Sequence, residues 1–225
     1  MNLEKYQQYS RIARGLEKAD LVLKDARIVN VFTEEIIRGD IAIQDGIIAG
    51  IGSFHGKEER DLAGRYVCPG FIDSHLHLES TLVTPAELVT AASRHGTTTF
   101  IVDPHESANV SGLAGIDYIL DQTEDVKANV YVMMPSCVPA TSIDDNGCTL
   151  SAEDMASYLH NRRILGLGEV MDSISVVQGE KSMHDKLELF EGRIRDGHAP
   201  FLEEGDLQAY AMAGIATDHE CSFFD

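Results

Sequence analysis

The feature that most constrains the fold is a regular alternation of apolar and helical segments after Arg65. Short apolar runs that favour strands recur at intervals of roughly 25 to 35 residues, with segments of helical spacing between them. The predicted strands are 67–77, 97–103, 128–135, 164–170, 198–202 and 214–219. The predicted helices are 85–95, 112–122, 151–161, 184–195 and 206–213. This order is typical of a parallel sheet built from about six βα units.

Two α/β architectures are compatible with this count of units. A closed (β/α)₈ barrel needs eight strands and about 250 residues for the barrel alone. The whole chain has 225 residues, and its front part follows a different pattern. The sequence therefore predicts either an open doubly wound sheet or an incomplete (β/α)₈ TIM-type barrel.

The front of the chain is predicted to be a separate module. Residues 3–18 have the apolar spacing of an amphipathic helix, and short β-branched runs separated by turns follow from Asp20. Asp45-Gly46 is the clearest hairpin signal. We expect a helix with a small antiparallel module, part of a β-sandwich, over 1–64, and the partial barrel over 65–225.

Composition limits the partners and the compartment. The formal net charge is −19, from 37 acidic and 18 basic side chains, which would repel nucleic acid and anionic lipid. No apolar run approaches the roughly 18 residues that span a membrane. The four cysteines are far apart and form no Cys-x-x-Cys pair. We expect a cytoplasmic protein that binds neither nucleic acid nor membrane.

Two histidines at the end of the first predicted strand indicate a metal site. His75 and His77 are two residues apart, and such residues point to the same face of an extended strand. One metal ion can therefore be held by both imidazoles. The same segment carries Asp73 and Glu79, which have the same parity.

Further polar residues follow the other predicted strands, where barrels of this kind collect their catalytic groups. They are His105 and Glu106 after the second strand, Glu169 in the fourth, His198 at the fifth, and His219 in the sixth. Four imidazoles and one carboxylate are enough to hold two divalent ions, and a carboxylate can bridge ions about 3.5 to 4 Å apart. Both ions would then acidify a shared water molecule.

Several side chains near these strand ends have more than one candidate role. His105 and Glu106 could line a substrate pocket or fix a loop. Glu79, Asp73 and Asp218 could orient a ligand histidine, because metal-bound imidazoles usually donate their other nitrogen to a carboxylate or carbonyl.

These motifs resemble a known family. Pro69-Gly70-Phe71-Ile72-Asp73-Ser74-His75-Leu76-His77 is similar to the first-strand motif of the amidohydrolase superfamily. Six ordered motifs are similar to its adenine deaminase branch: His77-Leu78-Glu79-Ser80, Asp103-Pro104-His105-Glu106, Met134-Pro135-Ser136-Cys137-Val138-Pro139-Ala140, Leu167-Gly168-Glu169-Val170-Met171, Gly197-His198-Ala199-Pro200 and Thr217-Asp218-His219-Glu220. The resemblance covers nearly the whole chain.

The resemblance implies a binuclear metal centre in a TIM-type barrel. It places His75 and His77 on one ion, His198 and His219 on the second, and Glu169 between them. It suggests manganese or iron, although imidazole and carboxylate ligands also suit zinc. The implied reaction is hydrolytic deamination of adenine to hypoxanthine and ammonia in purine salvage, with Glu169, His105 and Glu79 as candidate catalytic residues.

Other functions remain open at this point. A cyclic amidohydrolase of the hydantoinase or dihydroorotase type is the nearest alternative, but those relatives usually bridge their metals with a carboxylated lysine where Glu169 stands here. Members of the resembling branch are much longer and contribute a metal-binding aspartate from an eighth strand. We therefore expect an amino-terminal fragment that associates with a second copy or with a carboxyl-terminal portion. A truncated remnant that binds metal without catalysis is the alternative from a different class.

Overall fold

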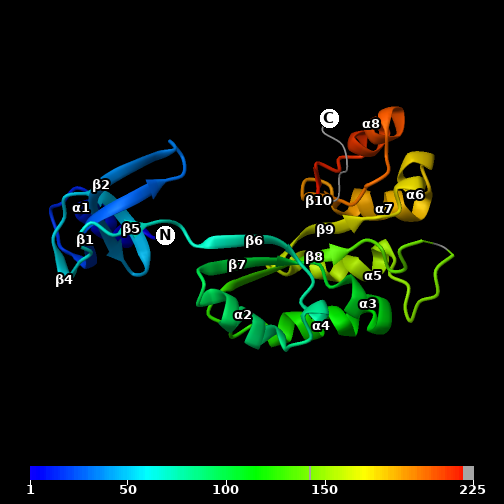
Figure 1. Ribbon diagram of the computed structural model, residues 1–225, viewed down its shortest axis with the longest axis horizontal. Coiled ribbons are helices and arrows are strands. Elements are labelled where there is room, and N and C mark those ends of the chain that lie inside the picture. The colour runs from blue at the N-terminus through cyan, green and yellow to red at the C-terminus, as the bar shows by residue number, and fades with distance from the viewer. Residues whose placement is uncertain (142, 220–225) are drawn as a thin grey trace. The chain divides into compact units, whose positions relative to one another are not determined.

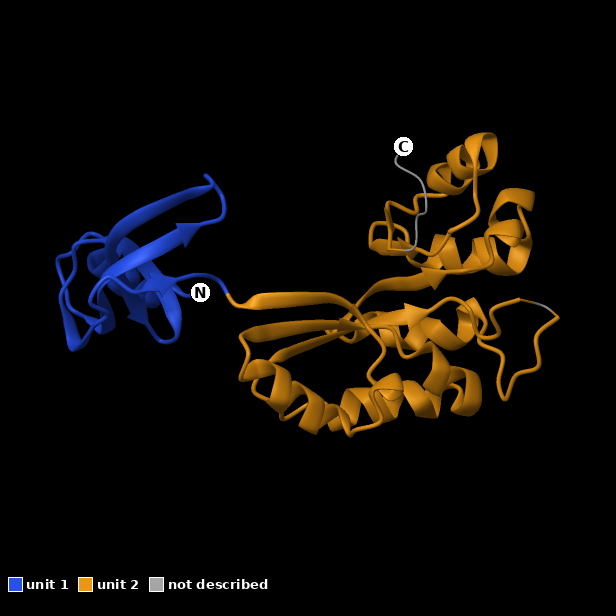
Figure 2. Ribbon diagram, viewed as in Figure 1, with its two compact units in different colours: residues 1–69 blue, residues 70–225 orange. Residues whose placement is uncertain are grey.

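The computed structural model describes residues 1–141 and 143–219. It divides into two compact units, Met1–Pro69 and Gly70–Asp225 (Figure 2). None of the helices within the described ranges is long and apolar enough to cross a membrane.

The first unit combines one helix with one mixed sheet. Its elements are α1 (Leu3–Ala13), β1 (Ala19–Asn30), β2 (Glu35–Gln44), β3 (Ile47–Gly52), β4 (Gly56–Asp61) and β5 (Tyr66–Val67). The helix ends five residues earlier than predicted. Gly15, with a φ of 70°, follows its last turn, and a left-handed glycine is a common helix terminator.

The sheet of this unit has the order β3-β2-β1-β4, with β5 also paired to β1. The hairpin predicted at Asp45-Gly46 joins β2 to β3, and both residues have the positive φ that a tight type I′ turn needs. The prediction of antiparallel pairing is correct for β1, β2 and β3. It is wrong for β4, which runs parallel to β1, and β5, outside the predicted antiparallel module, is also parallel to β1. Ile12 of α1 packs with Val22 and Phe54 in one hydrophobic cluster of the unit, and Ala26, Ile28 and Ile41 form another.

The second unit alternates strands with helices. Its strands are β6 (Phe71–Leu76), β7 (Thr97–Val102), β8 (Asn129–Pro135), β9 (Ile164–Val170), β10 (Ile194–Gly197) and β11 (Thr217–Asp218). Its helices are η1 (Glu79–Thr81), α2 (Pro85–Ser93), α3 (His105–Ser111), α4 (Leu113–Gln122), α5 (Ala152–Ala156), η2 (Ser157–His160), α6 (Ser173–Gln178), α7 (Lys181–Leu189) and α8 (Glu204–Met212).

These strands form one parallel sheet in the order β11-β10-β9-β8-β7-β6, which confirms an α/β fold with six βα units. The sheet is curled like part of a barrel, with α2, α3 and α4 along β6 to β8 and with α6, α7 and α8 near β9 and β10 (Figure 1). The central strands β8 and β9 are almost wholly buried. At the β6 edge, Phe71 and Ile72 are 62% and 63% exposed.

Several predicted boundaries differ from the structure. The first predicted strand is interrupted at Pro69-Gly70, because proline cannot donate to a strand ladder. The fifth strand is Ile194–Gly197 instead of 198–202, so His198 follows the strand rather than opening it. Arg195 and Asp196 give this short strand a polar composition that resembles a helix end. The sequence also missed α3 and α6, which are only 7 and 6 residues long.

Candidate metal centre

All five predicted ligands come together at the carboxyl ends of the parallel strands. His75 lies on β6 and His77 just after it, Glu169 lies on β9, and His198 and His219 follow β10 and β11. Each is brought there by the same property of parallel strands, whose carboxyl ends share one edge of the sheet. The residues span more than half of the sequence, yet their side chains form one cluster.

Glu169 is at the centre of this cluster. Its Oε1 lies 2.7 Å from Nε2 of His75 and 2.8 Å from Nε2 of His77. Its Oε2 lies 3.8 Å from Nδ1 of His198, and Oε1 lies 3.8 Å from Nε2 of His219. The carboxylate therefore stands between two pairs of imidazoles.

The imidazoles of each pair also lie close to each other. Nε2 of His75 is 3.1 Å from Nε2 of His77, and Nδ1 of His198 is 3.3 Å from Nε2 of His219. The rings of His75 and His219 stack with a centroid distance of 3.7 Å. Two three-residue groups, His75 with His77 and Glu169, and Glu169 with His198 and His219, have donor atoms within 4.8 Å of one another.

The hydrogen bonding of His77 shows that this donor set suits a cation. Its Nδ1 lies 2.7 Å from the carbonyl oxygen of Asp103, which can only accept, so Nδ1 carries a proton. In the neutral ring, Nε2 then turns its lone pair toward Oε1 of Glu169. While His77 is neutral, that buried oxygen has no hydrogen-bond partner among the described residues. Two facing acceptors need a proton or a metal ion between them.

The pKa values of His77 and Glu169 agree with a site that attracts positive charge. The hydrogen bond with Glu169 raises the pKa of His77 to about 9. Burial by itself raises the pKa of Glu169, but hydrogen bonding from His77 and the surrounding imidazoles lower it to about 2. Burial, followed by the nearby His219, lowers the pKa of His75. A metal ion would replace the proton on His77, because imidazole ligands bind in their neutral form.

Two aspartates that the sequence analysis did not assign to the site also belong to it. Oδ2 of Asp196 on β10 lies 3.6 Å from Nδ1 of both His75 and His219, and its other oxygen accepts from Thr217. Asp103 follows β7, is 1% exposed, and has no hydrogen-bond partner for either carboxylate oxygen among the described residues. Asp196 could have been found from its position two residues before His198, because residues two apart in an extended segment point to the same side.

His105 and Glu79 are not part of the five-residue cluster, but both adjoin it. His105 opens α3, and its Nδ1 lies 3.7 Å from Asp103 Oδ1 and 3.7 Å from Glu169 Oε2. Burial alone would lower the pKa of His105, but the Asp103 carboxylate raises it above its ordinary value. Oε1 of Glu79 accepts from the backbone N–H groups of Glu106 and Ser107, so Glu79 holds the first turn of α3.

The other predicted residues have structural partners. Oδ1 of Asp73 accepts from the backbone N–H of His75 at 3.4 Å, and Asp218 Oδ2 accepts from the N–H of Ala199 at 2.9 Å. Both carboxylates therefore hold the backbone next to a histidine or a strand end. Cys137 is buried, and burial raises its thiol pKa well above the ordinary value.

A pocket of about 460 Å³ opens next to the cluster. Its lining residues come from α3, from the segment after β8 and from the end of β9: His105, Glu106, Asn109, Val110, Cys137, Ala140, Asp144, Asp145 and Met171. His105 connects this pocket with Glu169.

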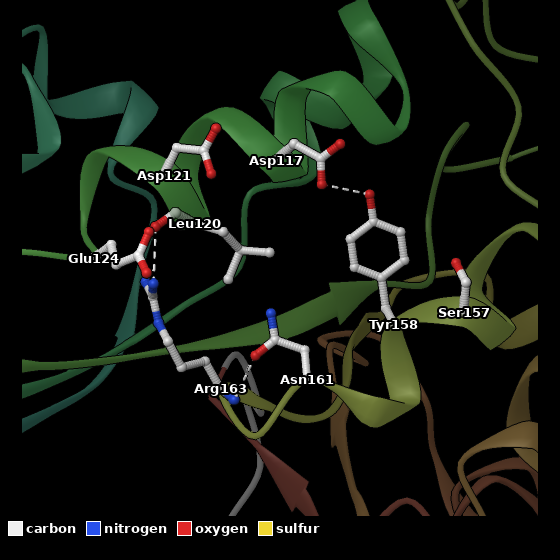
Figure 3. Close-up of a pocket in the computed structure, with 8 residues that line it drawn as sticks. All are labelled: Asp117, Leu120, Asp121, Glu124, Ser157, Tyr158, Asn161 and Arg163. Atoms are coloured by element: carbon white, nitrogen blue, oxygen red, sulfur yellow. Dashed lines mark hydrogen bonds between the residues drawn. The ribbon is translucent and has the colours of Figure 1, made fainter.

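A larger pocket, about 530 Å³, lies at the amino ends of β8 and β9, away from the histidines (Figure 3). Arg163 donates from this side to the carbonyl oxygens of Val130 and Leu120 at 3.0 and 2.8 Å, and Tyr158 donates to Asp117 at 2.6 Å. These bonds join α4 to η2, and they join the residue before β9 to α4 and β8. No histidine lines this pocket, so size alone does not identify the reactive site.

The chain is thus an α/β protein with a curled parallel sheet, and its histidines and carboxylates form a candidate metal site at the carboxyl edge of that sheet. The family model described as "Amidohydrolase family" matches residues 66–225, and the chain belongs to this family.

The chain is also similar to curated proteins named adenine deaminase. It is 57% identical over 221 residues to the one from Desulfitobacterium hafniense, which covers 98% of this chain and 39% of the relative. It is 50% identical over 212 residues to the one from Clostridium acetobutylicum, which covers 93% of this chain and 37% of the relative. The chain thus spans about two fifths of the length of these relatives.

Solved structures show the same fold at low sequence identity. One is N-acyl-D-glutamate deacylase from Bordetella bronchiseptica, complexed with zinc and a phosphonate inhibitor. Its TM-score is 0.61 at 18% sequence identity, and the match covers 89% of this chain and 51% of that one. The 5-methylcytosine deaminase from Klebsiella pneumoniae has a TM-score of 0.53 at 16% identity, with 85% of this chain covering 55% of that one.

Proposed function

We propose that this chain carries most of the metal site of an adenine deaminase, which hydrolyses adenine to hypoxanthine and ammonia. The observation that carries the proposal is the cluster in which Glu169 stands between the pairs His75/His77 and His198/His219. Similarity to proteins named adenine deaminase supports the choice of substrate. A glutamate at β9, where cyclic amidohydrolases usually have a carboxylated lysine, favours deamination over ring opening.

The residues of the cluster have distinct roles in this proposal. His75 and His77 would hold one divalent cation and His198 and His219 the other, with Glu169 available to both. Such cations supply Lewis-acid activation of a water molecule. Asp196 orients His75 and His219 through their Nδ1 atoms, as carboxylates commonly do for ligand histidines.

Proton transfer is assigned to His105, beside Glu169. Hydrolysis forms a C6–O bond, breaks the C6–N bond, and moves a proton from water to the departing amino nitrogen. Nδ1 of His105 lies 3.7 Å from Oε2 of Glu169 and provides a position for that proton next to the carboxylate that would hold the cations. Glu79 acts through α3 by fixing the first turn that carries His105.

The proposal extends to the metal and the cellular setting. Manganese or iron is the proposed metal, and the nitrogen and oxygen donors also suit zinc. We place the reaction in cytoplasmic purine salvage, with adenine as the small-molecule partner and with the site completed by association with a second copy or a carboxyl-terminal portion. The exposed β6 edge supports association, because unpaired strand edges favour pairing with other chains.

Ammonia release from adenine by the Mn²⁺-loaded chain tests the proposal. Glu169→Gln keeps the shape of the side chain and removes its charge, so we expect loss of bound metal and at least about 100-fold loss of activity. Glu153→Gln on α5 is the matched control, since Glu153 is exposed and belongs to none of the histidine and carboxylate groups. Equal metal content and activity in the two variants would contradict the assignment of Glu169.

The same assay separates the alternatives. Hydrolysis of hydantoin or dihydroorotate without ammonia release from adenine would favour a cyclic amidohydrolase. Turnover that occurs only after addition of a carboxyl-terminal portion would favour a chain that is inactive alone.

A further inference from the structure

The pocket next to the metal centre has a lining suited to one chemical class of ligand. Cys137, Val110 and Met171 contribute apolar surface, and sulfur atoms contact aromatic rings favourably. Among its lining residues the carboxylates are Glu106, Asp144 and Asp145, with no lysine or arginine. A phosphate group would be repelled here, so the lining favours a neutral planar ring over a nucleotide.

One helix face presents two polar groups to this pocket. His105 and Asn109 are four residues apart on α3, a spacing that places them on the same side of a helix. The backbone carbonyl of Asn109 accepts from the N–H of Gly147. Its side-chain amide forms no hydrogen bond with any residue in 1–141 or 143–219, so both its donor and its acceptor can bind a ligand.

The position of α3 is fixed on several sides. Glu79 accepts from the first backbone N–H groups of the helix, and Ser80 donates to Glu106. At the other end, a Cβ on Gly147 would lie 2.6 Å from the carbonyl oxygen of Val110, which shows how closely the following segment packs. Asn109 is therefore held on a rigid support next to His105.

We propose that Asn109 is the residue that recognises the base, with its side-chain amide bound to a ring-nitrogen edge of a neutral, unphosphorylated purine in this pocket. The inference rests on the proposed deaminase function and names its specificity residue. A carboxamide offers one donor and one acceptor in a plane, which matches the adjacent amino group and ring nitrogen of adenine. His105 lies between the bound base and Glu169 and links recognition to the reaction.

Binding of adenine to the metal-loaded chain, measured by equilibrium dialysis, tests this role. Asn109→Asp keeps the shape but removes the donor, and Asn109→Leu removes both hydrogen-bonding groups. We expect each to weaken adenine binding roughly 10- to 100-fold and to raise KM more than it lowers kcat. Bound Mn²⁺ and the far-UV spectrum should be unchanged. Asn129→Asp, at the amino end of β8, is the matched control and should bind adenine normally.

Adenine analogues identify the contacted edge. In the parent chain, 1-, 3- or 7-deazaadenine should bind more weakly than adenine at the position that Asn109 contacts. Asn109→Leu should bind that same analogue as well as it binds adenine, because the side chain that would contact the missing nitrogen is already absent. Adenosine monophosphate should not compete with adenine in either protein.

The outcomes separate this inference from the function on which it rests. A parent chain that neither binds adenine nor releases ammonia from it would overturn both. A parent chain that binds and deaminates adenine, with Asn109 variants that do the same, would overturn the inference alone. The inference would also be overturned if each deazaadenine lost as much affinity relative to adenine in Asn109→Leu as in the parent chain.

Discussion

Gly168 offers a sharp test of how the candidate metal centre is packed, because a methyl group has no room there. An ideal Cβ on Gly168 would lie 2.1 Å from Oδ2 of Asp103, 2.8 Å from its Cγ, and 2.8 Å from Cβ of Met133. The glycine therefore makes space for a fully buried carboxylate next to Glu169. Gly168→Ala must displace the Asp103 side chain, or the strand that carries residue 168.

The expected effect has two parts. Overpacking of a well-packed interior costs about 1 to 3 kcal/mol, and this cost should appear in the free energy of unfolding of the second unit. Displacement of Asp103 also disturbs the groups that surround the ligands, and such changes commonly weaken metal binding about 10- to 100-fold. We therefore expect lower stability and weaker Mn²⁺ binding together.

Urea unfolding followed by far-UV circular dichroism measures the stability, since the chain has no tryptophan for fluorescence. Two transitions are to be analysed separately if the two units unfold independently. Gly205→Ala in α8 is the matched control, because nothing lies within 4 Å of its added Cβ. Alanine there should be neutral or stabilise the protein by up to about 1 kcal/mol.

A double-mutant cycle with Asp103→Ala tests the cause. Removal of the Asp103 carboxylate deletes the closest clashing atoms, so part of the cost of Gly168→Ala should disappear in the double variant. The contact with Met133 remains and should leave a residual cost. Strictly additive effects, or a Gly168→Ala protein as stable as the parent, would refute the argument.

Three further predictions concern metal and charge. Chelation of metal from the loaded chain should destabilise only the second unit, by about 2.7 kcal/mol if free metal was at 100 times its Kd, which calorimetry can measure. In the first unit, burial alone raises the pKa of Asp40, but hydrogen bonds from Lys24 and two backbone amides lower it below 3.8. The ionised Asp40 carboxylate therefore stabilises the fold fully above its pKa in the unfolded chain, and this stabilisation is lost as the pH falls through its lower pKa in the folded chain. In Asp40→Asn, the free energy of unfolding should consequently depend less on pH on the acid side. An unchanged pH dependence would contradict this. Arg163→Met should cost about 2 to 4 kcal/mol in urea unfolding, because the carbonyl oxygens of Val130 and Leu120 each lose a charged donor. Arg163→Lys should cost less, and equal stability of the parent and Arg163→Met would contradict the contacts.

Some of the fold could be predicted because its signals are local. The apolar runs of β8 and β9 and the turn at Asp45-Gly46 depend on neighbouring residues only. The strand before His198 was misplaced because four residues with two charges carry little periodic signal. The short helix α3 was missed because 7 residues hold too few repeats to reveal a helical period.

The sequence by itself determined the candidate ligands, because parity along a strand and position after a strand follow from covalent geometry. His75, His77, Glu169 and His219 could be named in this way, whereas His198 was named although its strand was placed four residues too late. Only the tertiary structure decided that Asp196 and Asp103 join them, that Glu79 holds α3, and that Asn109 faces a pocket beside Glu169. These relations are distances between residues remote in the chain, and such distances are set by how the strands pair and how the helices pack on them.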